Sequence, residues 1–215
     1  MIRPFFRRFH KILALLMRAL MRIMAPRYRV SGRHHLPHRG PVIFASNHMS
    51  DFDPPVLGAA IRFPIVWMAK RELWKIAWLA PILDFFCCFA VDPASPDRAA
   101  IKQALEVLKN GDALVVFPEG RISPDGELGE ILPGALLIAM KSGATVIPVG
   151  LWGSQFIVPH GQIVPRPTPG KVRVHFGAPL HFDDLKGLGS RDAREIGAAR
   201  LEAAIRQAVS VARGS

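Results

Sequence analysis

The feature that most constrains the fold of this chain is its alternation of short apolar runs with longer amphipathic segments. Strand-like runs lie at residues 41–47, 63–69, 85–91, 112–120 and 145–153, and an alternating, half-exposed strand is predicted at 171–177. Helix-like segments lie at residues 53–61, 71–83, 95–111, 133–144 and 190–214. Strands that alternate with helices predict an α/β fold, with a mostly parallel central sheet flanked by helices.

The helix predicted at 95–111 has the clearest end signals. Ser95 is a suitable first residue, the apolar residues then recur at helical spacing, and Gly111 is a suitable end. The four tryptophans are expected mostly in the core: Trp67, Trp74, Trp78 and Trp152. Trp74 and Trp78 are also spaced as in a helix that rests in a membrane interface.

The first 26 residues differ in character from the rest. On a helical wheel the cationic residues fall close to one line: Arg7, Lys11, Arg18 and Arg22. The apolar residues gather on the opposite side: Phe5, Phe9, Ile12, Leu16, Leu20, Ile23 and Met24. The longest charge-free run is too short to span a bilayer, and Pro26 ends the pattern. We therefore predict two parts: an amphipathic membrane-surface segment at 1–26 and a single domain at 27–215, which is long enough to form its own hydrophobic core. An ordinary surface helix is the alternative.

The net charge and the cysteine content indicate which partners and which cellular compartment to expect. The formal net charge is +11, which predicts attraction to something anionic, such as nucleic acid, an acidic lipid surface or phosphorylated substrates. Cys87 and Cys88 are adjacent, so no disulfide framework is expected and a reducing cytosol is the natural compartment.

A polar loop follows the first predicted strand, in the stretch ASNHMSDFDP at residues 45–54. Active groups of parallel sheets collect at the carboxyl ends of strands, which makes His48 a candidate general base with Asp53 as its partner. Asp51 is a rival partner. The alternative is that Ser50 and Asp53 form a capping box at the start of the following helix. In that case Asp53 has only a structural role, and the presence of His48 is not explained.

A second polar loop, FPEGRIS at 117–123, follows the fourth predicted strand. Gly120 permits a tight turn and Arg121 offers a planar fork that matches a phosphate, while Glu119 could steer Arg121 or bind a substrate hydroxyl. An exposed Glu–Arg pair on a turn is an equally good interpretation.

Together these pieces resemble the glycerolipid acyltransferase family. NHMSDFD matches its His-x4-Asp signature, FPEGRIS its phosphate-binding block and VIPVG (146–150) a later strand block. MAKREL (68–73) matches a stretch common in lysophosphatidate acyltransferases. The four blocks stand in the family's order over roughly residues 27–180.

The resemblance implies a reaction and roles. His48 would act as general base on the sn-2 hydroxyl of 1-acyl-glycerol-3-phosphate, which attacks the thioester of acyl-CoA or of an acyl carrier protein, and Asp53 would orient its ring. Arg121 would bind the phosphate, with Gly120 opening the turn, Glu119 ordering the loop and Lys70 as a second phosphate contact. No metal or resident cofactor is implied. The product would be phosphatidate, made at the cytoplasmic face of the cell membrane.

One block departs from the family pattern. Many members carry an arginine after the third strand that binds the acceptor phosphate, and this chain has Pro93 there. That arrangement looks more like domains that reacylate lysophosphatidylethanolamine, so this acceptor is the alternative. Arg98 or Lys102 of the following helix could compensate.

Other classes of function make different predictions. A non-enzymatic, basic membrane-surface module would use only the charge, and nucleic-acid binding is disfavoured because basic residues do not run together with interleaved aromatics. A thioesterase could use the same dyad on water, although the chain has no Gly-x-Ser-x-Gly elbow. The histidines in HHLPH (34–38) lack acidic or thiol partners nearby, so no metal site is predicted.

Overall fold

A central sheet organises the computed structural model, which describes residues 4–38, 40–92, 97–162 and 164–215. Over these ranges seven strands pair in the order β1-β7-β6-β2-β5-β3-β4. Their bounds are β1 Arg29–Ser31, β2 Val42–Ser46, β3 Ile65–Lys70, β4 Cys88–Val91, β5 Ala113–Val116, β6 Thr145–Trp152 and β7 Arg173–Phe176. Every neighbouring pair is parallel except β6 and β7. The predicted mostly parallel α/β fold is confirmed.

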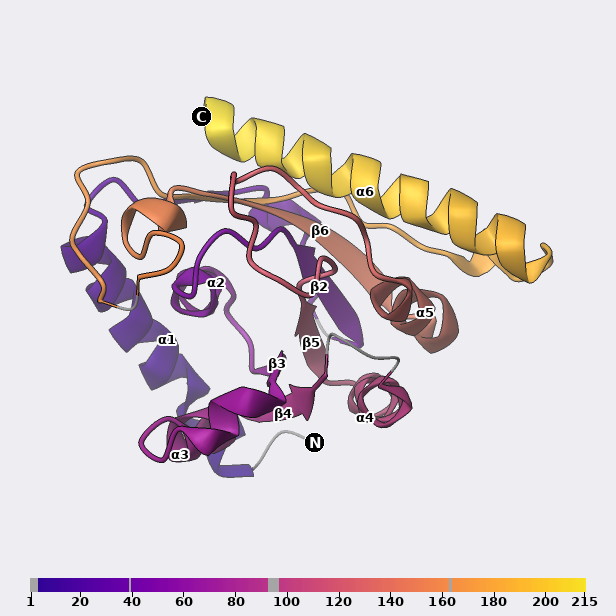
Figure 1. Ribbon diagram of the computed structural model, residues 1–215, viewed down its shortest axis with the longest axis horizontal. Coiled ribbons are helices and arrows are strands. Elements are labelled where there is room, and N and C mark those ends of the chain that lie inside the picture. The colour runs from indigo at the N-terminus through magenta and orange to yellow at the C-terminus, as the bar shows by residue number, and fades with distance from the viewer. Residues whose placement is uncertain (1–3, 39, 93–96, 163) are drawn as a thin grey trace.

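Helices cover both faces of the sheet (Figure 1). On one face lie α1 (Pro4–Met24) and α2 (Asp53–Ala60), and on the other lie α4 (Arg98–Lys109), α5 (Pro133–Ser142) and α6 (Ser190–Gly214). The short helix α3 (Ala80–Phe85) precedes the edge strand β4. Within the described residues there are also four short 3₁₀ helices: η1 Arg33–His35, η2 Arg71–Lys75, η3 Ser154–Phe156 and η4 Asp183–Leu185.

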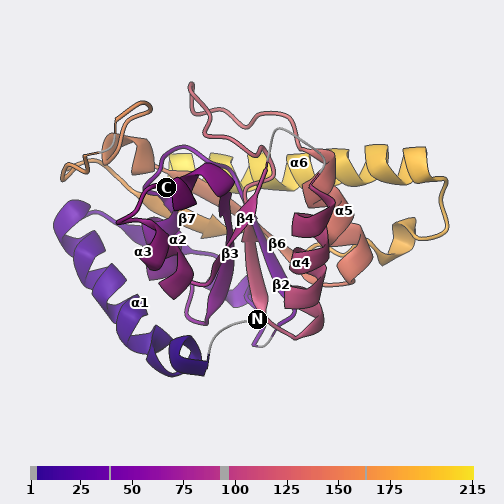
Figure 2. The ribbon, with the colours of Figure 1, turned by 60° about the horizontal axis from the view of Figure 1, so that its bottom comes forward.

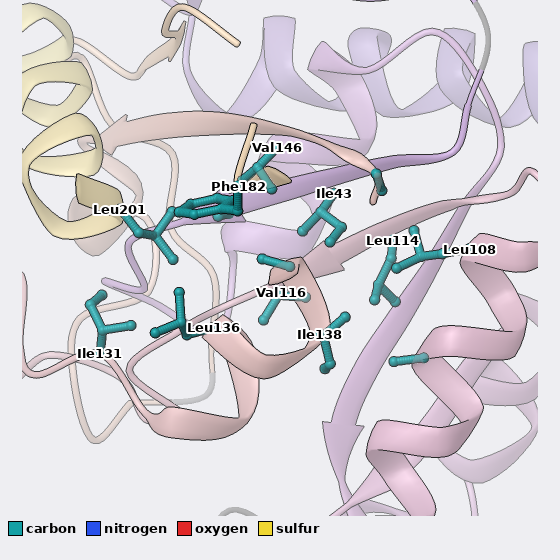
Figure 3. Close-up of a cluster of buried hydrophobic side chains, with 14 of the residues drawn as sticks. Ile43, Leu108, Leu114, Val116, Ile131, Leu136, Ile138, Val146, Phe182 and Leu201 are labelled. Atoms are coloured by element: carbon teal, nitrogen blue, oxygen red, sulfur yellow. The ribbon is translucent and has the colours of Figure 1, made fainter. Parts of the chain in front are cut away.

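Two cores follow from the alternation of side chains along the strands. Ile43 of β2 packs on the α4–α6 face with Leu114 of β5, while Phe44 packs on the α1–α2 face with Val115. Figure 3 shows the first cluster, where Leu136 of α5 and Leu201 of α6 meet side chains from the strands. Because both faces are covered, the central strands are apolar at nearly every position, as the continuous runs predicted.

The edge with β1 and β7 was only partly predicted. The short strand β1 was not predicted, because its residues are exposed or half-buried and form no apolar run. β7 forms as expected but is mostly buried rather than half-exposed, and it runs antiparallel to β6. Its reversal brings the chain back to the amino edge of the sheet, so α6 then runs along β6 toward the carboxyl edge.

The segment predicted as one helix at 71–83 is broken. It forms η2 and then α3, whose first turn contains Pro81, a residue suited to starting a helix rather than continuing one. The strand predicted at 85–91 begins only at Cys88, because α3 runs to Phe85 and Cys87 turns the chain with φ of 58°. Between η2 and α3, Trp78 is 70% exposed, so its predicted core position is wrong.

The helix predicted at 95–111 starts later than expected. α4 begins at Arg98, and Asp97 provides the cap by accepting a hydrogen bond from the backbone of Ala100 at 2.9 Å. Ser95, the predicted start, lies outside the described residues. Gly111 has φ of 75° just after the last helical turn, which is the left-handed conformation that glycine favours at a helix end.

α1 is amphipathic in a different way from the prediction. It packs on α2 through one side, where Met21 is fully buried and Arg18 donates from Nε to the carbonyl of Ala59 at 3.2 Å. The cationic line therefore partly faces the domain. The outward side is apolar and carries Phe9, Ile12, Leu15, Leu16 and Ile23, which are 38–68% exposed. Within the described residues, no helix combines the length and hydropathy that crossing a bilayer requires.

Candidate active site

Two polar loops meet at the carboxyl edge of the sheet. β2 and β5 are neighbouring parallel strands, so the loop that follows Ser46 lies beside the loop that follows Val116. His48 joins them directly, because its carbonyl accepts from the backbone N–H of Ser123 at 2.8 Å. The predicted meeting of the two loops is thus what the fold produces.

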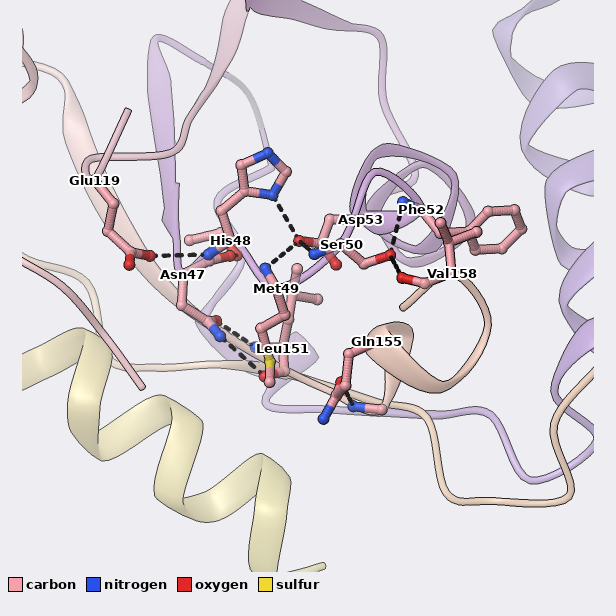
Figure 4. Close-up of polar contacts among 12 residues, drawn as sticks. Asn47, His48, Met49, Ser50, Phe52, Asp53, Glu119, Leu151, Gln155 and Val158 are labelled. Carbon is pink, nitrogen blue, oxygen red and sulfur yellow. Dashed lines mark hydrogen bonds and ion pairs between the residues drawn. The ribbon is translucent and has the colours of Figure 1, made fainter. Parts of the chain in front are cut away.

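His48 and Asp53 form a hydrogen-bonded pair (Figure 4). Nδ1 of the ring lies 2.7 Å from Oδ2 of Asp53, whose side chain is fully buried, whereas the His48 side chain is 17% exposed. The same carboxylate oxygen accepts from the backbone N–H groups of Met49 at 2.7 Å and Ser50 at 3.0 Å. When Nδ1 carries the proton that it donates to Asp53, Nε2 is left free to accept one, which suits a general base.

The capping box considered at Ser50 forms in part. The carboxylate of Asp53 accepts from the backbone N–H of Ser50 at 3.0 Å, which is the reciprocal bond of a capping box, although the regular helix α2 begins only at Asp53. The hydroxyl of Ser50 donates to the carbonyl of Val158 at 2.7 Å and accepts from the N–H of Phe52. The rival partner Asp51 is exposed, and the carboxylate that binds the ring is that of Asp53.

Glu119 orders the two loops, and it is buried rather than exposed. One oxygen accepts from the backbone N–H of His48 at 2.9 Å, and the other accepts from Gly129 at 2.8 Å. Burial raises the pKa of this carboxyl, and the two backbone N–H groups partly offset that rise. The predicted exposed pair of Glu119 with Arg121 is therefore wrong, because Glu119 binds backbone on both sides.

Two further residues position the histidine and were missed. The ring of Phe117 stacks on the imidazole of His48, with 3.9 Å between ring centroids and 15° between planes. The side-chain amide of Asn47 donates to the carbonyl of Leu151 and accepts from its N–H, which ties the loop to β6. The sequence shows an asparagine and an aromatic residue next to the motifs, but their partners depend on strand order and could not be identified from it.

The predicted anion-binding residues lie around the same opening as His48. Lys70 and Arg121 are exposed, and both line a cavity of about 1980 Å³ that His48 and Gly120 also line. Gly120 has φ of 64°, a conformation that favours glycine, and its N–H donates to the carbonyl of Phe117. One cavity is thus lined by a base and by two cations, which are the kinds of group needed to accept a proton and to bind an anionic molecule.

The rest of the cavity wall is mostly apolar. It includes Leu13 and Met17 of α1, Ile82 and Phe86 near α3, and Cys88 of β4. Burial raises the pKa of the Cys88 thiol to about 12, so this cysteine is not available as a thiolate nucleophile near neutral pH. Within the described part of the chain, no cluster of three or more His, Cys, Asp or Glu side chains is arranged to hold a metal ion.

The loop behind Arg121 is braced by the last helix. Arg206 of α6 donates to the carbonyl of Leu128 at 3.0 Å, and Arg213 lies 3.1 Å from the carboxylate of Glu127. Gly129, one residue beyond Leu128, is the residue that Glu119 holds. The loop that carries Arg121 is therefore fixed at one end to His48 and at the other to α6.

Comparison with known proteins gives a consistent result. The family model described as Acyltransferase matches residues 27–152. The chain is 30% identical over 166 residues to the 1-acyl-sn-glycerol-3-phosphate acyltransferase of Bacillus subtilis, covering 76% of this chain and 79% of that protein. It is also 30% identical over 187 residues to the chloroplastic 1-acyl-sn-glycerol-3-phosphate acyltransferase LPAT1 of Arabidopsis thaliana, covering 83% of this chain but only 50% of that relative.

A solved structure is similar over most of the chain. It is the 1-acyl-sn-glycerophosphate acyltransferase PlsC of Thermotoga maritima, with a TM-score of 0.72 and 26% sequence identity. The match covers 94% of this chain and 81% of that protein. The fold of this chain therefore agrees with that of a known acyltransferase structure.

Proposed function

This chain belongs to the acyltransferase family, and we propose that it transfers a fatty acyl group from an acyl thioester to the sn-2 hydroxyl of 1-acyl-glycerol-3-phosphate. The observation that carries the proposal is the hydrogen-bonded pair of His48 and Asp53 beside Arg121 and Lys70 in one cavity. The product is phosphatidate. Acyl-CoA and acyl carrier protein both fit as the thioester donor, and the reaction needs no resident cofactor.

The proposed reaction moves one proton through His48. Nε2 of His48 accepts the hydroxyl proton while the hydroxyl oxygen attacks the thioester carbonyl, and the resulting imidazolium is stabilised by Asp53 through Nδ1. When the tetrahedral intermediate collapses, the carbon–sulfur bond breaks and His48 returns the proton to the departing thiolate. The attacking oxygen belongs to the substrate, so no acyl-enzyme forms.

The phosphate of the acceptor is proposed to bind at Arg121 and Lys70. A guanidinium binds a phosphate through two parallel hydrogen bonds, and the ammonium of Lys70 adds a second positive charge. Gly120 keeps the turn open, and Glu119 holds the loop to the backbone of His48, so the distance from phosphate to base is fixed.

The choice of acceptor is the finer part of the proposal. Pro93, which replaces the family's arginine, lies outside the described residues, and lysophosphatidylethanolamine is the alternative acceptor. The relatives named above act on 1-acyl-glycerol-3-phosphate by their names, which supports the phosphatidate-forming reaction.

A lysolipid panel tests this proposal together with Arg121→Ala. We expect the purified protein to acylate 1-acyl-glycerol-3-phosphate in preference to lysophosphatidylethanolamine. Arg121→Ala should raise the KM for lysophosphatidate by about tenfold, the effect of one charge-assisted pair. Arg191→Ala removes an exposed arginine outside the cavity and should leave this KM unchanged. Acylation of lysophosphatidylethanolamine alone would contradict the acceptor, and absence of transfer to any lysolipid would contradict the activity.

The apolar outer side of α1 is proposed to bind the membrane surface. Exposed Ile12, Leu15 and Leu16 would enter the boundary between headgroups and acyl chains, and the net charge of +11 favours anionic lipid. The opposite side of α1 lines the cavity at Leu13 and Met17, so a lysolipid could reach His48 from the bilayer. Peripheral attachment at the cytoplasmic face of the cell membrane is part of the same proposal.

Vesicle flotation tests the attachment. Leu16→Glu places a charge on the outer side of α1, where the leucine is 56% exposed, and we expect binding to phosphatidylglycerol-rich vesicles to weaken at least tenfold, since burial of one leucine contributes roughly 1.5–3 kcal/mol. Ile196→Glu makes the same kind of change at a 44% exposed site on α6 and should have little effect. Equal flotation of both variants would show that α1 does not bind the membrane.

A further inference from the structure

The cavity does not end at the proposed phosphate site. Beyond His48 and Arg121 it continues along α5, on the opposite face of the sheet from α1, and is lined there by Pro133, Leu137 and Lys141. These three positions are spaced four apart and form a stripe along one side of the helix, and Gly134, Ala135, Ile138 and Met140 line the cavity from the neighbouring sides. The mechanism described so far uses none of these residues.

The stripe leads directly away from the site. The N–H of Leu132, just before α5, donates to the carbonyl of Pro118 at 2.8 Å, which fixes the start of the helix beside Glu119. Ten residues of helix span about 15 Å. Lys141, in the last turn of α5, therefore stands roughly that far from the loop that carries Arg121.

Apolar side chains line the middle of this groove, and cations lie at its far end. Figure 2 shows α5 between α4 and α6, and Ile101 of α4 lines the same cavity as Leu137. Two other exposed cations line the same cavity: Lys186, just before α6, and Arg194 in the first turns of α6, the helix that packs on α5.

The partners of these cations identify which of them can bind an anion. Lys186 is paired with the carboxylate of Asp183, which neutralises it. Arg194 donates from Nε to the carbonyl of Ser190 at 2.8 Å and lies 3.4 Å from the Ser190 hydroxyl, both of which are uncharged. Lys141 and Arg194 thus provide the positive charge at the end of the groove.

We propose that this groove holds the phosphopantetheine arm of the acyl thioester, with its phosphate at Lys141 and Arg194. The inference rests on the proposed function. The arm is a narrow, uncharged chain whose extended length is comparable to that of α5, and it carries its thioester at one end and its phosphate at the other. It therefore matches a groove that runs from His48 to two cations. The lysolipid and the donor then approach His48 from opposite faces of the sheet.

Coenzyme A and acyl carrier protein share this arm, so the experiment compares three donors. The rates of palmitoyl-CoA, palmitoyl-carrier protein and palmitoyl-pantetheine, which lacks a phosphate, are measured with the full-length protein. In Lys141→Glu/Arg194→Glu we expect kcat/KM for a phosphorylated donor to fall at least tenfold relative to palmitoyl-pantetheine. If the relative kcat/KM falls for only one of the two phosphorylated donors, the result still supports binding in the groove and identifies that donor as the one that binds there.

The control variant is Lys109→Glu/Arg191→Glu, which makes the same change of charge at exposed positions outside the cavity. It should leave the ratio of donor rates unchanged. An unchanged ratio in the groove variant, or an equal fall in both double variants, would overturn the proposal. If no lysolipid is acylated by the unmodified protein, calorimetric binding of free coenzyme A to the same three proteins gives the answer independently: weaker binding only in the groove variant supports the site, and equal binding overturns it.

Discussion

Replacing His48 with alanine is expected to lower kcat for acyl transfer by ~10²–10⁴-fold, the usual contribution of general-base catalysis. The hydroxyl would still be held beside the thioester, but no group would accept its proton as the oxygen attacks. The KM values for both substrates should change little, because the ring is proposed to act on the reacting atoms and not on the phosphate. Steady-state rates at several lysophosphatidate concentrations separate the two parameters.

The matched control for this variant is His34→Ala. His34 is exposed in η1 and does not line the cavity, so its removal should leave kcat unchanged. Thermal unfolding of both variants shows whether the change in rate reflects a change in folding. Full activity in a folded His48→Ala protein would end the proposed mechanism.

Substitutions of Asp53 are expected to lower kcat by different amounts, with a much larger loss for Asp53→Ala than for Asp53→Asn. Oδ2 of Asp53 accepts from three N–H donors, while Oδ1 is buried and has no hydrogen-bond partner among the described residues. An asparagine will therefore place its oxygen at the Oδ2 position and its amide at the Oδ1 position. The ring keeps its orientation and loses only a charged partner, so kcat should fall about tenfold.

Asp53→Ala removes the acceptor altogether. The imidazole loses its orientation, and the buried N–H groups of Met49 and Ser50 are left without their partner, so kcat should fall on the order of 10³-fold. The free energy of unfolding should also fall by about 1–3 kcal/mol for each unpaired group. Urea denaturation and steady-state rates give both quantities.

Asp51→Asn is the control for the series, since Asp51 is an exposed carboxylate in the same loop. It should have little effect on kcat. Equal losses for Asp53→Asn and Asp53→Ala would show that charge alone matters, and would contradict the ordering inferred from the three N–H donors.

Most of the layered fold could be predicted because it is encoded locally. Strands covered on both faces are continuous apolar runs, which made β2, β5 and β6 visible in the sequence. The two polar loops were predictable for the same reason, since each follows such a run directly. The family resemblance, carried by four short blocks in order, is confirmed by the match over residues 27–152.

The features that could not be predicted from the sequence depend on contacts between residues that are far apart in the chain. Glu119 looked like the partner of a nearby arginine, but its partners are the backbones of His48 and Gly129, which only the strand order brings close. The exposure of Trp78 follows from the break between η2 and α3, which helical spacing could not show. The roles of His48, Arg121 and Lys70 remain predictions that the variants above will test.

The antiparallel run of β7 has a consequence for how this enzyme could diverge. A single reversed strand sends the chain's last helix back toward the carboxyl edge of the sheet, where Arg206 and Arg213 bind the segment that follows the turn carrying Arg121. Substitutions in the final turns of α6 should therefore alter substrate choice, although Arg206 and Arg213 do not line the cavity. Relatives with different C-terminal helices should be compared first for headgroup preference.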